Sequence, residues 1–422
     1  LWNATNGSLV KNATNDNGVA GAIWTSNGPT AEPTFQVPAA NAGALTNGCR
    51  LSASNTLSNP TNDVTGATSV YLLPHKHDKI SLYSGSGSAW NDRVITSLAL
   101  ALAPFGVARL VDVHVWDNAG VAAIEGTAWD SGGQVSANIS SVSLALPCVI
   151  TTSAAHGMGV GNVIAIAQGT STGTVWTDAD RKITNKFFKV SAVTSTTLTL
   201  ENVDTSSLTA TAYTNAKVYK IPSARTTAAV KQNGVWSKSG ALTRRLVGTV
   251  YIDTTGGTND TVSLRHVSNV DNVEPATWGC EDTTASYLPS NTGLFFPRTN
   301  STALAKTRCE VVFALDGVAG IDFTDSFDYS AVGGGGASLL GIDTMFPASL
   351  STWQGVLEYP VSAFSANANY TIYSAYSNSG TRKFAAGLHF IQQMQYGIGI
   401  TYHGRAYTGN PLQSAVKASI LR

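Results

Sequence analysis

Charged residues are scarce in this sequence: they make up 12% of 422 residues, against roughly 25% in an average soluble protein. Acidic and basic residues balance at 26 each, and no run of Lys or Arg extends beyond Arg244-Arg245. The basic patch by which a protein binds nucleic acid or an anionic membrane is therefore missing. We expect neither of them as a partner.

Long hydrophobic runs are also missing. No apolar stretch approaches the ~20 residues of a transmembrane helix, so we expect no membrane insertion. The chain begins at Leu1 without Met, and no charged segment followed by an apolar one opens it. We therefore expect no signal peptide, and the start is compatible with a processed or trimmed end.

Cysteine is rare, with four residues at Cys49, Cys148, Cys280 and Cys309. No two of them have the C-x-x-C spacing of a zinc site or a redox motif. We expect four small buried side chains, because free cysteine behaves as a small hydrophobe. A Cys280–Cys309 disulfide across a sheet is the alternative.

Strand and turn chemistry is abundant. In residues 109–129, Val111, Val113 and Val115 alternate with other side chains, which is the period of a strand with two unlike faces. Residues 117–120 supply a turn, and a second strand follows, so we predict a hairpin. No stretch of ten or more residues has a convincing helical pattern. The predicted fold class is therefore all-β, with β-sandwich or barrel domains.

Changes in texture divide the chain into four parts. Residues 1–47 contain only short apolar segments between turns, too few to form a core. We predict a thin connector here or, alternatively, a disordered linker. Residues 48–139 and 223–278 share one β-rich texture and predict a single interrupted domain. Residues 140–222 between them predict a small inserted barrel-like module, and residues 279–422 a C-terminal β-sandwich.

The segment NPTNDVTGATSVYLLPHKHDKISLYSGSGSAWN carries a recognisable pattern. A DVTGAT strand at residues 63–68 is followed by Tyr71, then by I-x-L-Y-x-G at residues 80–85 and by Trp90. The pattern continues in VHVWDNAG and GTAWDS, and it resumes after residue 223 in NGVWSKSGALTRRLVGTVY and near the end in GLHFIQQMQYG. These motifs resemble the tail fibre and minor structural proteins of tailed bacteriophages.

The interrupting segment is similar to a small β-module of phage structural proteins. Its motif residues are His156-Gly157, Val160-Gly161 and the Ser195-Thr196-Thr197 run, with Asn162 where Asp is usual. In the relatives the two flanking halves are contiguous, which favours an insertion. The resemblance covers most of residues 49–422.

The resemblance implies a protein on the exterior of a phage virion, on the tail or attached to the capsid. As a tail fibre or spike it would be a homotrimer, bound to other virion proteins through residues 1–47. It would adhere to a host-surface polysaccharide or protein, with residues 279–422 as the candidate receptor-binding domain. One alternative is a capsid- or neck-attached decoration fibre with a structural role only. A second is a polysaccharide depolymerase, which needs two carboxylates across a groove.

The best metal-like cluster is formed by His75, His77 and Asp78. Alternating imidazoles and a carboxylate suit zinc or nickel, but a site needs further ligands that the sequence does not provide. We predict a solvated loop at this position. We expect no metal, no cofactor and no catalytic residue, and hence not an enzyme.

Tyrosines crowd the last third of the chain among Asn, Ser and Gly. Tyr gives a rigid, amphipathic contact area at low entropy cost, which suits recognition of sugars or protein loops. Cross-strand pairing within a sheet is the alternative. The candidate receptor contacts are Tyr370, Tyr373, Tyr376, Tyr402 and Tyr407.

Overall fold

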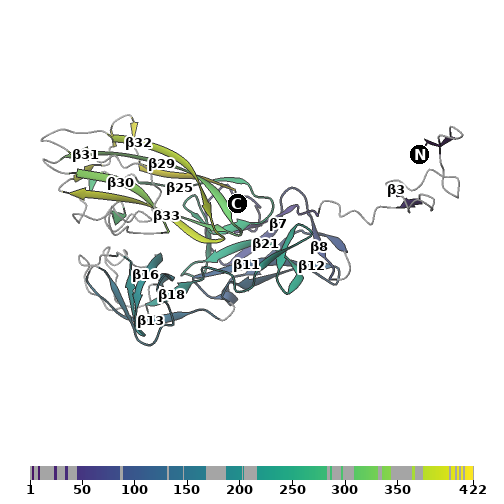
Figure 1. Ribbon diagram of the computed structural model, residues 1–422, viewed down its shortest axis with the longest axis horizontal. Helices are drawn as coiled ribbons and strands as arrows, with labels where there is room; N and C mark the ends of the chain where they lie inside the picture. Colours follow the sequence, from purple (N-terminus) through teal and green to yellow (C-terminus); the bar gives the residue numbers. More distant parts are fainter. Residues whose placement is uncertain are drawn as a thin grey trace.

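A computed structural model gives the fold (Figure 1). It describes residues 45–282, 308–330, 335–343, 374–398 and 414–421, with gaps at 86–88, 131–132, 146, 168–186, 202 and 204–215, and a few short strands outside these ranges. Side chains are described over 45–276, 278–279, 308–320, 343 and 383–391, with the same gaps. Among these residues every element is a strand except one 3-10 turn, η1 (Ala103–Phe105), so the all-β prediction is confirmed.

The predicted hairpin lies in the central sheet. Strand β11 (Arg109–Asn118) pairs with β12 (Val121–Ala128), and the turn uses positive φ angles at Ala119 and Gly120. On its other side β11 pairs with β21 (Ala241–Ile252), which is followed in the sheet by β20 (Val235–Lys238) and β19 (Ala229–Gln232). Strand β24 (Val267–Asn269) also pairs with β21.

The two faces of β11 enter different cores, as the alternating pattern predicts. Val111, Val113 and Val115 are fully buried in one core, while Leu110 points to the other. The first core is completed by a three-stranded sheet and a hairpin. These are β5 (Cys49–Ser52), β7 (Ser69–Pro74) and β10 (Leu98–Ala101), with β8 (Lys79–Tyr83) paired to β9 (Trp90–Val94).

A closed barrel stands between β12 and β19 in the sequence and forms its own lobe (Figure 1). Its strands are β13 (Ser136–Val142), β14 (Val149–Thr152), β15 (Val163–Ala167), β16 (Phe187–Val193), β17 (Thr197–Leu200) and β18 (Lys217–Ile221). Because β12 and β19 belong to one sheet, the chain leaves that sheet, closes the barrel and returns to it. The first barrel strand begins before residue 140, where the texture changes.

The C-terminal strands do not stand apart from the interrupted domain. One sheet joins β6 (Val64–Ala67), β22 (Thr258–Asp260) and β23 (Leu264–Arg265) to β28 (Arg308–Phe313), β33 (Gly387–Ile398), β30 (Gly335–Ile342) and the short β31 (Phe364–Ser365), and β27 (Phe296–Pro297) pairs with β33. A second sheet joins β25 (Pro275–Asp282), β37 (Ser414–Leu421), β29 (Gly317–Ser330), β34 (Thr401–His403) and β26 (Ser286–Tyr287), with β32 (Ser374–Phe384) paired to β29.

Strand β25 therefore crosses residue 279, where the sequence predicts a domain boundary. No Pro or Asn-Gly turn interrupts the run around Trp278, so the strand continues along β37. The structure differs from the sequence prediction here because sheet pairing joins segments that lie far apart along the chain.

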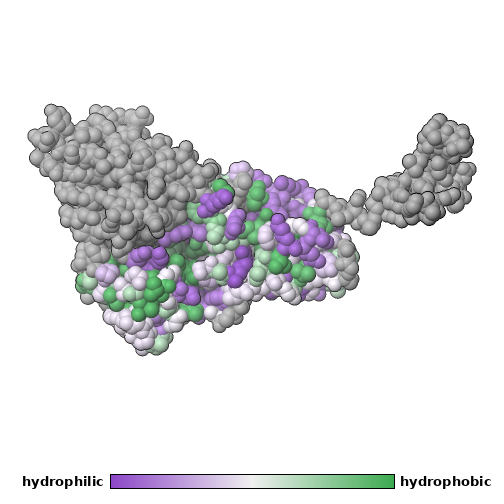
Figure 2. All heavy atoms as spheres, viewed as in Figure 1, coloured by the Kyte–Doolittle hydropathy of each residue, from purple (hydrophilic) through white to green (hydrophobic). Residues whose placement is uncertain are grey.

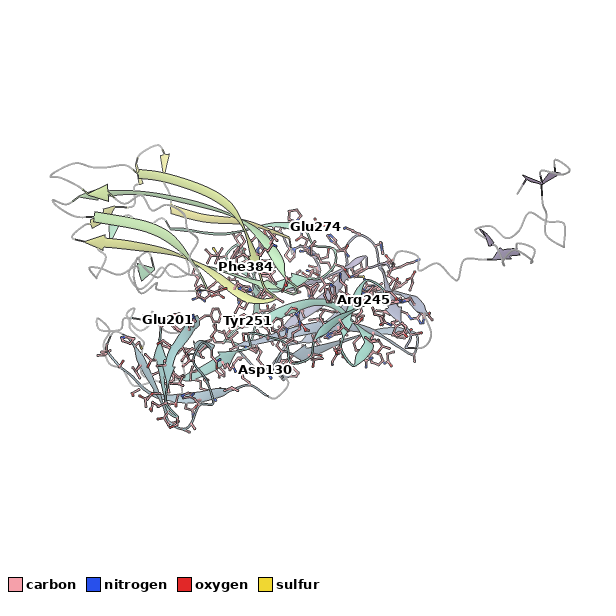
Figure 3. All side chains as sticks on the ribbon, in the orientation of Figure 1. Asp130, Glu201, Arg245, Tyr251, Glu274 and Phe384 are labelled. Atoms are coloured by element: carbon pink, nitrogen blue, oxygen red, sulfur yellow. The ribbon has the colours of Figure 1, made fainter. Side chains whose placement is uncertain are left out.

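The second core spans the barrel, the central sheet and the C-terminal strands. It contains Phe187 and Phe188 of the barrel, Tyr251 of β21, and Val312 and Phe390 of the C-terminal strands. Tyr251 lies where the barrel lobe meets the C-terminal strands (Figure 3). The barrel is thus anchored by shared apolar packing as well as by its two connections.

At the N-terminal end, β1 (Trp2–Asn3) pairs with β2 (Ser8–Leu9), and β3 (Ile23–Thr25) pairs with β4 (Thr34–Gln36). Strand β3 lies away from the other labelled strands (Figure 1). The rest of 1–44 lies outside the described residues, so the connector stays a prediction. Within the described part of the chain, no helix has the length and apolarity to cross a membrane.

Candidate functional site

A buried carboxylate sits where the barrel leaves and rejoins the central sheet. Asp112 of β11 is 4% exposed, and Arg225, in the returning connection, donates to it twice, at 2.5 Å (Nε to Oδ2) and 2.9 Å (Nη2 to Oδ1). Trp129, in the departing connection, donates its indole N–H to Asp112 Oδ1 at 2.8 Å. Thr249 of β21 donates its hydroxyl to the same oxygen at 2.7 Å. We call these four residues the connector hub.

The connector hub ties three parts of the molecule together. Arg225 stacks over the Trp129 ring at 4.3 Å and also donates to the carbonyl of Ala314, next to β28. The Thr226 hydroxyl donates to the Trp129 carbonyl at 2.6 Å. Asp112 accepts four hydrogen bonds, which leaves it little capacity to act as a base. The hub is therefore a structural device that joins both barrel connections to the sheet.

A second buried ionic group lies in the core shared by the barrel and the C-terminal strands. Glu310 accepts from His266 at 3.0 Å and forms an ion pair with Arg308 at 3.1 Å. Arg308 lies over the Phe187 and Phe390 rings at 4.7 and 4.0 Å. Burial lowers the pKa of the Arg308 guanidinium, and Glu310 opposes this shift. Like the connector hub, this group joins units of the fold.

The structure does not bring the histidine-aspartate cluster together as a metal site. His75 hydrogen-bonds with Glu274 (Nε2 to Oε1, 3.0 Å) and with Ser58 (3.1 Å). His77 hydrogen-bonds with Thr46 (2.9 Å), and the hydrogen bond from His75 lowers the pKa of Glu274. In the described residues no group of three or more His, Cys, Asp or Glu side chains could hold a metal ion. Asp78 therefore does not join His75 and His77 in such a group.

The predicted tyrosine contacts fall largely outside what the structure describes. Tyr370 and Tyr373 lie outside the described residues. Tyr376 lies on β32 opposite Asp325, Tyr402 on β34 opposite Tyr287 and Tyr329, and Tyr407 opposite Asn410, with only their backbones described. Receptor contact through these residues stays a prediction.

The cysteine prediction is tested at three positions: Cys49, Cys148 and Cys309 are buried. Burial raises the pKa of the Cys49 thiol to about 12, which keeps it protonated and unreactive. The side chain of Cys280 lies outside the described residues, so the alternative of a Cys280–Cys309 disulfide is not tested.

A depression opens where β5, β6 and β7 come together. It is lined by residues 53–55, 64, 66–69 and 71. The polar lining groups are the side chains of Ser54, Asn55, Thr68 and Ser69, and the half-buried ring of Tyr71 adds an amphipathic surface. None of the residues lining this depression is charged.

The walls of the depression are held by local hydrogen bonds. Ser54 Oγ accepts from the backbone N–H groups of Thr56 and Leu57 at 3.3 and 3.2 Å, and the Ser52 hydroxyl donates to the carbonyl of Leu57 at 2.7 Å. On the opposite side, Gly66 has φ +62°, a left-handed conformation that glycine adopts freely, and its N–H donates to Asn259 Oδ1 at 2.9 Å. The lining is thus preorganised.

Sequence reasoning missed this depression as a site, although six of its nine lining residues lie within residues 63–71, the DVTGAT-x-x-Y motif. The motif carries the resemblance to phage proteins, but the concave shape of the depression also depends on residues 53–55, which follow β5. Its neutral hydroxyl, amide and aromatic groups can bind an uncharged polar ligand. On the face shown in Figure 2, the described surface mixes hydrophilic and hydrophobic residues in small areas.

No protein-family model and no curated protein matches the chain. Solved structures with some likeness include the isomalto-dextranase of Arthrobacter globiformis T6 (10% identity, TM-score 0.16) and the infectious bursal disease virus Gx strain (10%, 0.18). A third is a Bacillus thuringiensis Cry1Da tryptic core variant (7%, 0.15). The alignments cover 67%, 74% and 84% of this chain, but 35%, 71% and 48% of those chains, so it spans about a third of the first and about half of the third. At these TM-scores none of them places the chain in a family.

Proposed function

We propose that this chain is a structural and adhesive protein on the exterior of a bacteriophage particle, a tail fibre or spike that contacts the host surface. The observation that carries the proposal is the phage-fibre pattern in residues 63–90, 113–131 and 233–251. The low charge and the all-β architecture suit such a role.

The contacts made by the pattern residues support this proposal. Tyr83 and Trp90, from the I-x-L-Y-x-G and Trp positions, face each other across the β8–β9 hairpin with ring centroids 5.5 Å apart. Arg244, from the motif after the barrel, stacks on Trp116, from the motif before it, at 3.8 Å. Residues of the pattern that the barrel separates in sequence thus meet in one sheet.

Arg245, the second arginine of the same motif, is also bound internally. It is buried, and it donates to the carbonyls of Thr46 and Ser81 at 2.9 and 2.8 Å and to Asp271 at 2.9 Å. The pattern therefore encodes a rigid scaffold. A scaffold of this kind fits a fibre, whereas a polysaccharide depolymerase would need two carboxylates across a groove.

We expect the chain to form a homotrimer through the contacts of its N-terminal connector and its β-domains. Light scattering of the purified full chain should give a mass three times the 43.9 kDa of one chain. Removing residues 1–44 should shift the scattering toward the monomer. A stable monomer of the intact chain would contradict the trimer and leave the adhesive role to be tested separately.

The position on the particle tests the adhesive role against the purely structural one. Gold-labelled antibodies against the chain should mark the tail of intact particles in negative stain, and the purified chain should slow particle adsorption to host cells. Label on the head or neck, with unchanged adsorption, would favour the decoration fibre instead. An antibody against the major capsid protein serves as the control for labelling position.

A further inference from the structure

We infer that the depression lined by residues 53–71 binds a neutral saccharide. This inference rests on the proposed adhesive function and gives it a ligand class. It concerns a region far in sequence from the tyrosines that sequence reasoning proposes as receptor contacts.

The size and shape of the depression suit a small polar ligand. Its volume is about 390 Å³, and small-molecule sites span roughly 300–1,000 Å³. It is open to solvent, so a sugar unit at the end or the side of a longer chain can enter it. A ligand held in such a site keeps part of its surface in water, which fits a hydrophilic polymer.

The absence of charge in the lining narrows the ligand class. Phosphate, sulfate and carboxylate groups are bound by Arg or Lys, often with two parallel hydrogen bonds. The lining contains neither, and the adjacent Asp63 is occupied in accepting from the Val262 N–H at 3.1 Å. Nucleotides, phosphopeptides and acidic sugars therefore find no counter-charge here.

The functional groups of the lining match a sugar. The hydroxyls of Thr68 and Ser69 and the amide of Asn55 can each donate and accept, as sugar hydroxyls do, and the Ser54 hydroxyl, whose oxygen already accepts two backbone N–H groups, can donate. The Tyr71 ring offers an apolar face with a polar tip, on which the C–H face of a sugar can pack. Val64 contributes further apolar surface.

An extended peptide fits the same place less well. Strand β6 ends its sheet, so its free edge is the position where a peptide strand would add. However, Gly66 interrupts the extended backbone with φ +62°, and the β6–β22 register shifts between Thr258 and Asp260. Irregularities of this kind protect an edge from strand addition.

Close backbone packing makes the β6 wall rigid. A Cβ on Gly257 would lie 2.7 Å from the Cα of Gly66, so the two backbones touch. Such close packing leaves the β6 wall little room to shift, which lowers the entropy cost of binding.

The test uses the purified full chain on an array of neutral oligosaccharides of glucose, galactose, mannose and N-acetylglucosamine, with sialylated and sulfated glycans as further arms. We expect binding to one or more neutral glycans. Tyr71→Ala and Thr68→Arg should each weaken it by about tenfold or more, because one removes the ring and the other fills the depression.

Thr68 is exposed, so Thr68→Arg should fold normally even if Tyr71→Ala does not. The matched control is Thr96→Arg. Thr96 is exposed and precedes β10, whereas the other end of β10, at Ala101, pairs with Ser69 beside the depression, so this variant should bind as the unchanged chain does. Binding only to acidic glycans, or equal binding by Thr68→Arg and Thr96→Arg, would overturn the inference. Tail labelling with no glycan binding would overturn it while leaving the proposed function in place.

Discussion

Replacing Asp112 by alanine should lower the free energy of unfolding by about 3–5 kcal/mol. The substitution removes a carboxylate that accepts from Arg225, Trp129 and Thr249, and it leaves the arginine, whose side chain is only 11% exposed, without its carboxylate partner. An unpaired buried cation costs far more than the net gain of the pair, because its hydration is lost without compensation. The measurement is urea unfolding followed by tryptophan fluorescence, to which Trp129 itself contributes.

Two further variants sharpen this prediction. Asp112→Asn keeps the shape but turns an NH₂ group toward the donors, so it should destabilise the fold by an amount between zero and that of Asp112→Ala. Glu201→Ala removes a carboxylate whose partner Lys189 is half exposed, and it should cost about 1 kcal/mol or less. If Asp112→Ala costs no more than Glu201→Ala, the connector hub does not hold the barrel connections.

The contrast between β11 and the connector hub shows what sequence reasoning can reach. The period-two pattern of Val111, Val113 and Val115 predicts a strand and the face that it buries, since alternation is a local property. The pairing of Asp112 with Arg225 joins residues 113 positions apart, and no local pattern links them. The change of texture near residue 140 indicates a separate unit, and a closed barrel occupies Ser136–Ile221.

The C-terminal boundary and the depression were beyond sequence reasoning for the same reason. Strand β6 lies beside β22, far along the chain, and both continue the sheet of β28. A boundary drawn from turn signals cannot detect that pairing. Likewise the depression forms only because the residues after β5 lie beside β6 and β7. The DVTGAT-x-x-Y motif therefore predicts a strand but not the depression next to it.

Acid should destabilise this protein through His114. The side chain is 3% exposed on β11, and burial lowers its pKa to about 4; Lys238 and Arg225 act in the same direction, while Asp112 and Glu125 oppose them. In the unfolded chain a histidine has a pKa of about 6.5. Between these two values the unfolded chain binds more protons than the folded one, so stability falls as the pH falls from about 6.5 to about 4.

The difference between the two pKa values sets the loss of stability, which is roughly 3 kcal/mol over the whole range from about pH 6.5 to about pH 4. Carboxylates also titrate in this range, so the measurable quantity is the difference between the unchanged chain and His114→Phe, which cannot take up the proton. Urea unfolding at pH 7.5 and at pH 4.5 should show a smaller loss of stability for His114→Phe. Equal losses in both proteins would mean that His114 is charged in the folded state.

His389 provides the opposite case and hence the control. Burial lowers its pKa, but the hydrogen bond and charge of Asp343, 2.6 Å away, outweigh burial and raise it overall. Its contribution to stability is present below the unfolded pKa and is lost as the pH rises through the folded one. Relative to the unchanged chain, His389→Phe should therefore be less stable at pH 4.5 than at pH 7.5. His114→Phe should instead be relatively more stable at pH 4.5 than at pH 7.5. Both variants remove an imidazole, so a pH dependence of stability that changes in opposite directions in the two variants would trace the effect to the surroundings of each imidazole. These surroundings are burial for His114 and the Asp343 carboxylate for His389.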